Sequence, residues 1–185
     1  MKKLVILLCA LSLVAAGALA LGLPGGGGKV DTKKIDEALT AVKDIADRFT
    51  AAKTKVEKCD TTLKAVCTKY GIADVLADPA NAAALKDKLT AEDKSLLQTD
   101  FQAMATVATD VNAIVTEVPT VSTKIANGLA DIVNQISANP LAAGDLNKKK
   151  DELTAAKTNV ETITKDAPAL IEAATKLSST VGGMF

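Results

Sequence analysis

The sequence predicts an all-α fold, an elongated up-down-up bundle of three long helices with a short extra helix between the first and the second. Apolar residues recur every seven positions in three long stretches, as in helices that pack side by side with coiled-coil-like heptads. No segment alternates apolar and polar residues between turn signals, so no sheet is expected. Because the connections are short, neighbouring long helices must run antiparallel.

The first long helix is expected to begin near Lys33, where Asp31 or Thr32 can accept hydrogen bonds from free backbone N–H groups. It should end at Tyr70, because Gly71 suits the left-handed conformation that often follows a helix. Two columns of mostly apolar residues with a spacing of seven predict its buried face: Ile35, Val42, Phe49, Val56, Leu63 and Tyr70, with Ala38, Ile45, Ala52, Cys59 and Val66.

The short extra helix and the middle helix both begin at recognisable caps. Asp78-Pro79 pairs an N-cap residue with a favoured first helical residue, ahead of the alanine-rich segment 80–89. Thr90 and Asp93 resemble a capping box at the start of the middle helix. The expected columns of that helix are Leu97, Met104, Val111, Val118, Ile125 and Ile132, with Phe101, Ala108, Val115, Ser122, Leu129 and Ile136.

Two prolines lie inside the long helices. Pro119 interrupts the middle helix, but the apolar repeat keeps its phase across it, which favours one kinked helix over two separate ones. Ser122 could bond the carbonyl that the proline frees, or mark a hinge. Pro168 lies in the last helix in the same way. We therefore single out Pro119, Ser122 and Pro168 as candidate hinge residues, against the simpler interpretation of a purely structural role.

The last helix follows a turn at Asn139-Pro140 and is expected to start at 144–145 and to end at Gly182. Lys149 takes a nominally buried position near its start, where a long side chain can reach solvent. Its columns are Leu146, Leu153, Val160, Ala167, Ala174 and Val181, with Ala156, Ile163, Leu170 and Leu177.

The N-terminus has the pattern of a secretory signal peptide. Lys2 and Lys3 precede an uncharged apolar run, and Ala18 and Ala20 fit the small-residue rule for cleavage. We assign residues 1–20 to the signal, 21–30 to a glycine-rich flexible leader and 31–183 to a single helical domain. A retained membrane anchor is the alternative. The short Lys-Lys signal and the lack of an N-x-[ST] sequon favour a bacterial protein exported to the periplasm or beyond.

Composition excludes several classes of function. The chain has 22 basic and 22 acidic residues, so loss of Lys2 and Lys3 leaves a net charge of −2, which does not favour nucleic acid. Aromatic residues make up 2%, so base stacking is not expected either. Histidine is absent, which removes histidine-based catalysis and histidine-ligated metals. We expect no cofactor and no metal site.

Cys59 and Cys67 are the two cysteines that remain after the signal, and export suggests a disulfide. Eight residues along a continuous helix rise about 12 Å, whereas a disulfide needs Cα atoms within about 7 Å. Either the helix breaks near Asp60, or the thiols do not bridge each other. The unbroken apolar repeat favours the continuous helix, and an intermolecular bridge through Cys67 is then the remaining redox role.

The sequence thus predicts an exported, non-enzymatic protein of the cell envelope that works by binding, as a scaffold or adaptor or as a holdase-like chaperone. A protein partner is expected, and homo-oligomers are compatible with the pattern. The alternative is a membrane-active protein whose amphipathic helices open onto lipid. An enzyme is disfavoured because none of the expected buried columns contains an acidic residue.

Overall fold

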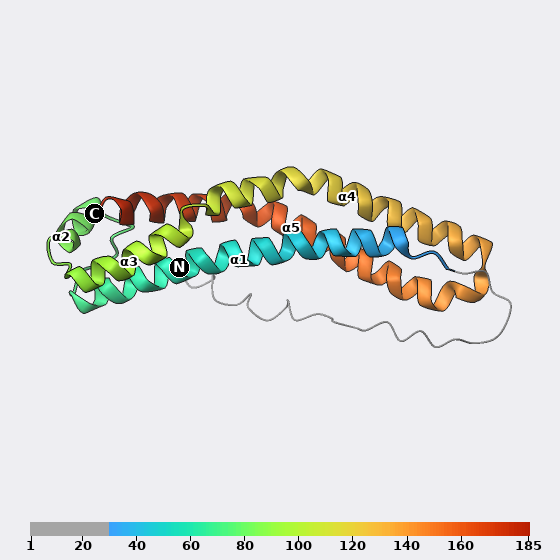
Figure 1. The fold of residues 1–185 in the computed structure, drawn as a ribbon, viewed down its shortest axis with the longest axis horizontal. Helices are drawn as coiled ribbons and strands as arrows, with labels where there is room; N and C mark the ends of the chain where they lie inside the picture. The colour runs from blue at the N-terminus through green and yellow to red at the C-terminus, as the bar shows by residue number, and fades with distance from the viewer. Residues whose placement is uncertain (1–29) are drawn as a thin grey trace.

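A computed structural model describes residues 30–185, so the predicted signal and nearly all of the leader lie outside the described residues. Figure 1 shows a long rod built from helices alone in this part of the chain. The elements are α1 (Lys33–Lys69), α2 (Pro79–Lys86), α3 (Ala91–Met104), α4 (Val107–Ala138), the 3₁₀ turn η1 (Pro140–Ala142) and α5 (Ala143–Gly182).

The three long helices run up, down and up, as predicted. Helices α1, α4 and α5 each contact the other two, and α1 and α5 point the same way along the rod (Figure 1). Helix α3 lies against α1 and α5 where α4 no longer covers them, and α2 sits at that end of the rod beside the C-terminus. The predicted all-α, elongated bundle with a short helix after the first long one is confirmed.

Local sequence signals account for several helix ends. Gly71 has φ +63°, and its N–H donates to the carbonyl of Thr68, while Ile72 N–H donates to the carbonyl of Cys67. These two bonds form the Schellman motif that a glycine after a helix favours. The Asp78 carboxylate accepts from Ala80 N–H at 2.9 Å, with Pro79 in the first helical position.

The middle helix differs from the prediction because it is broken. The expected single helix from Thr90 onward is divided into α3 and α4 by a turn at Ala105 and Thr106. Pro119, where the sequence suggested a kink, lies inside the continuous helix α4 and is exposed. A proline lacks the N–H that would bond the carbonyl four residues earlier, here that of Val115. Because the ring of Pro119 lies on the exposed face of α4 and not in the core, the helix continues through it.

The buried face of the middle helix is also rotated from the expected one. Leu97, Met104, Val111, Ile125 and Ile132 are buried as predicted, and Val118 is partly buried. The second expected column was wrong: its members are exposed or only partly buried. The buried second column lies on the other side of the first and consists of Asp93, Asp100, Val107, Ile114, Val121 and Gly128.

Gly128 accounts for the close approach of α4 to α1 and α5 near the end of the rod where α1 begins. A Cβ atom on Gly128 would lie 2.9 Å from Leu153 Cδ1 of α5 and 3.6 Å from Ile35 Cα of α1. The missing side chain therefore lets α4 approach both neighbours at once. Leu129, which the apolar repeat placed in the core, is turned to the side of the helix and is only partly buried.

The columns of α1 and α5 agree closely with the prediction. Every predicted member is buried except Tyr70 and Leu170, which are partly buried against the core. Lys149 occupies a predicted core position but is only partly buried. Its Nζ lies 3.4 Å from Asp36 Oδ1 and 3.2 Å from Glu152 Oε2. At the far end Met184 is buried, and the rings of Phe101 and Phe185 lie 6.1 Å apart. Helix α1 and helix α5 therefore supply most of the core.

Candidate functional site

Two carboxylates are buried on α3, and they are the only charged side chains buried among residues 30–185. Asp93 is 6% exposed and Asp100 is 2% exposed. They lie two helical turns apart and both face α1. The sequence argument against buried acids was therefore wrong, because it placed the second column of this helix one residue too late.

Asp93 is held by three side chains, those of Lys69, Tyr70 and Thr90. Lys69 Nζ lies 2.8 Å from both carboxylate oxygens, and the Tyr70 hydroxyl donates to Oδ2 at 2.5 Å. The Thr90 hydroxyl donates to the same oxygen at 2.7 Å, and it also accepts from Asp93 N–H at 3.2 Å. The hydrogen bonds from Lys69, Tyr70 and Thr90 hold the pKa of Asp93 well below its ordinary value.

The capping box predicted at this point is formed only in part. Thr90 caps α3 through its hydroxyl, as the pattern predicts. The Asp93 carboxylate, however, turns toward α1, and the backbone N–H of Thr90 donates instead to the Tyr70 hydroxyl at 3.4 Å. Asp93 thus joins the start of α3 to the end of α1.

Asp100 forms the second connection between α3 and α1. Thr62 donates its hydroxyl to Oδ2 at 2.5 Å, and Lys58 Nζ lies 2.9 Å from Oδ1. Burial alone raises the pKa of this carboxyl, but the Thr62 hydrogen bond and the Lys58 ammonium outweigh it, and the pKa lies below its ordinary value. The group is therefore ionised at neutral pH.

Cys59 and Cys67 are both buried free thiols on one unbroken helix. The predicted continuous helix is confirmed, and its eight-residue spacing keeps the two thiols about 12 Å apart along the axis. Burial, reinforced by the charges of Asp100 and Asp60, raises the pKa of Cys59 to about 11. Burial also raises the pKa of Cys67. Both thiols are therefore protonated at neutral pH and poor nucleophiles, so a redox role, including an intermolecular bridge, requires the bundle to open first.

The candidate hinge residues lie apart from this cluster. Pro119, Ser122 and Pro168 are all exposed, and the two prolines lie inside continuous helices. Ser122 does not lie in the core, where the sequence placed it. The carbonyl of Pro119 accepts from the hydroxyl of Thr123, four residues further along the helix, at 2.9 Å. The hinge role of these three residues stays a prediction.

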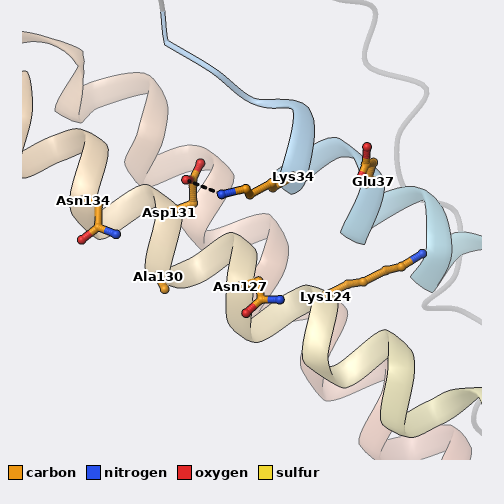
Figure 2. Close-up of a pocket in the computed structure, with 7 residues that line it drawn as sticks. All are labelled: Lys34, Glu37, Lys124, Asn127, Ala130, Asp131 and Asn134. Carbon is orange, nitrogen blue, oxygen red and sulfur yellow. Dashed lines mark hydrogen bonds and ion pairs between the residues drawn. The ribbon is translucent and has the colours of Figure 1, made fainter.

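The surface carries a polar groove between α1 and α4 that the sequence did not reveal. One section of about 460 Å³ is lined by Lys34 and Glu37 of α1 and by Lys124, Asn127, Ala130, Asp131 and Asn134 of α4. Figure 2 shows Lys34 reaching across to Asp131, with an N–O distance of 3.5 Å, and Lys124 extending toward the first turns of α1. Asn127 and Asn134 are exposed on the α4 side.

A second section, of about 880 Å³, continues the groove and shares Glu37 and Lys124 with the first. It adds side chains such as Thr40, Thr116 and Thr120. Glu117 of α4, which also lines this section, pairs with Arg48 of α1 at 2.9 Å. We call the two sections together the α1–α4 groove. Its lining of amides, hydroxyls and both charges suits hydrogen bonding to another polypeptide.

The described residues hold no group of three or more side chains arranged to bind a metal ion. Helices long and apolar enough to cross a membrane are also not found between residues 30 and 185. The buried carboxylates are fully engaged by lysines and hydroxyls, which is a structural arrangement and leaves neither of them free as an acid or a base.

Comparison with known proteins adds no relative: no family model, curated protein or solved structure matches this chain.

Proposed function

We propose that this protein is an exported, non-enzymatic binding protein of the bacterial cell envelope, acting as a scaffold or as a holdase-like chaperone. The observation that carries the proposal is the α1–α4 groove, an open polar groove along two neighbouring antiparallel helices. The secretory pattern of residues 1–20 supports export. The engaged carboxylates and protonated thiols support binding in preference to catalysis.

The groove gives the proposal a place that can be tested. A photo-crosslinking amino acid is placed at Asn127 or Asn134 in the groove and, as a matched control, at Asn159 on the exposed face of α5. Binding at the groove predicts covalent adducts in the native host from the first two positions and none from the control. Equal adduct formation at all three positions, or none at any, would contradict it.

The identity of the adducts separates the two modes of binding. One dominant protein captured from the groove indicates a scaffold or adaptor, whereas a broad set of unfolded envelope proteins indicates a holdase. Charge reversal by Lys124→Glu, which alters both sections of the groove, should weaken either kind of capture. Lys157→Glu on the exposed face of α5 should leave capture unchanged.

A membrane-active role is the second candidate, and one surface observation favours it. Leu141 in the η1 turn is 92% exposed, and Val133 near the end of α4 is 57% exposed. Apolar side chains at a rod tip can enter a lipid interface. If this role holds, the mature chain floats with anionic lipid vesicles at low salt and Leu141→Asp reduces flotation. No flotation at low salt excludes it.

A further inference from the structure

Helices α3 and α4, which together form the middle part of the chain, bury faces of different composition. Helix α4 buries apolar residues and Gly128 along its whole length. Helix α3 buries only four residues, and two of them are the aspartates: Asp93, Leu97, Asp100 and Met104. Two of the four buried residues of α3 are therefore charged groups that can form hydrogen bonds with water once the helix is exposed. The buried residues of α4 have no charged side chains.

The junction between the two helices interrupts the backbone hydrogen bonds of the helix. Ala105 N–H donates to the carbonyl of Gln102, a short turn bond, and the next helix starts again at Val107. The Thr106 side chain does not cap α4 but bonds to Asp110 at 2.8 Å. The chain can therefore change direction at Ala105 and Thr106 without breaking a continuous helix.

We propose that α3 is a latch, a helix that leaves the face of α1 and α5 as a unit by turning about Ala105–Thr106 while α4 stays packed. Two ion pairs hold α3 on α1 in the docked state: Asp93 pairs with Lys69, and Asp100 pairs with Lys58. Both lysine side chains are more than half exposed, at 52% and 66%, so the pairs separate directly into water.

Release of α3 would uncover part of the apolar core at this end of the rod. Cys59 lies on α1 between Lys58 and Thr62, the two residues that contact Asp100 of α3. Leu63 and Val66 continue the same face of α1 toward the end of the helix. Cys59 is therefore a built-in reporter, because it is buried when α3 is docked and becomes accessible when α3 leaves.

The first test uses hydrogen exchange of the full mature chain, followed peptide by peptide under native conditions and in low denaturant. A latch predicts that amides of α3 and of α1 near residues 58–69 exchange faster than those of α4 and the first half of α1. Loss of protection in α3 and α4 at the same denaturant concentration would overturn the proposal, because the two helices would then open together.

The second test measures the labelling rate of Cys59 with a small disulfide reagent, and peptide mass spectrometry distinguishes Cys59 from Cys67. Asp100→Asn should raise the rate at Cys59 about tenfold or more, since one charged contact of α3 is lost. Lys69→Gln unpairs Asp93 but leaves the Asp100 charge in place, so a higher rate in this variant cannot come from removal of the charge that raises the pKa of Cys59. Asp47→Asn, which removes an exposed acid that pairs with Lys43 within α1, is the matched control and should leave the rate unchanged. If the control raises the rate as much as the other two variants, if Lys69→Gln leaves it unchanged, or if α4 loses protection in Asp100→Asn, local release of α3 is excluded.

These tests need no binding partner, so they are independent of the proposed function. Failure of the latch would leave binding at the α1–α4 groove intact, and failure of crosslinking at the groove would not affect the latch. The groove residues lie on the first turns of α1 and on α4, away from the α3 contacts.

Discussion

Helices α3 and α4 both pack against α1 and α5, but they bury side chains of different chemistry. In α4, residues such as Ile114 and Ile132 are fully buried, and Gly128 lets the helix come close to its neighbours. In α3, Leu97 and Met104 share the interface with two ionised aspartates. Apolar burial is tolerant of small shifts along the rod, whereas each aspartate must meet a particular lysine and hydroxyl. We infer that α4 supplies stability and that α3 supplies register.

The largest effect is expected in the apolar half. Ile132→Ala removes a fully buried side chain and should lower the free energy of unfolding by about 2–5 kcal/mol. Urea unfolding followed by circular dichroism measures this loss. Val133→Ala is the matched control at the next, exposed position and should change stability by less than about 0.5 kcal/mol. Similar losses for both would show that α4 is packed differently from the structure.

An intermediate effect is expected in the charged half, and it depends on pH. The pKa values of Asp93 and Asp100 are lowered by folding, so their stabilising contribution is present above the ordinary aspartate pKa and is lost as the pH falls through the folded values. The free energy of unfolding should therefore decline steeply below about pH 4.

Asp100→Asn sharpens this test. It should lower stability at pH 7 by about 1–3 kcal/mol, because Lys58 loses its charged partner and Asp100 is 2% exposed. The acid-side slope should become shallower, since one group with a lowered pKa has been removed. Asp47→Asn, at the solvent-exposed Lys43–Asp47 pair within α1, should leave the slope unchanged within error. An unaltered slope in Asp100→Asn would contradict the assigned pKa direction.

The smallest effect distinguishes the starts of the two helices. Thr90→Ala removes the hydroxyl that caps α3 and also bonds Asp93, so it should cost about 1 kcal/mol. Thr106→Ala at the start of α4 should cost less than about 0.5 kcal/mol, because its side chain makes no cap hydrogen bond. Thermal unfolding of the two variants side by side measures the difference. Equal costs would mean that the cap of α3 contributes nothing specific.

Sequence patterns predicted α1 and α5 well because their buried positions are almost all apolar. The column from Ile35 to Leu63 and the column from Leu146 to Val181 appear in the structure as expected. Backbone signals were equally reliable: Gly71 ends α1, and Pro79 starts α2. These features depend on the chain nearby and need no knowledge of the partner helix.

The middle helix was harder for a definite reason. Two columns with a spacing of seven lie beside Leu97 and Met104: the observed one, which includes Asp93 and Asp100, and the predicted one, which includes Phe101 and Val115. The pattern alone favoured the side with Phe101 and Val115, since an acid is costly to bury without a partner. The partners are Lys58, Thr62, Lys69 and Tyr70 on another helix, and no local pattern predicts that they meet the acids.

The sequence by itself thus determined that the folded part is helical, where most of its helices begin and end, and that the long helices alternate in direction. Periodicity and capping are local, and short connections leave few ways to pack long helices. Only the tertiary structure decided which side of the middle helix is buried, where that helix breaks, and that a polar groove lies between α1 and α4. Those properties depend on the distance between helices and on charges that meet across them, which exist only once the chain has folded.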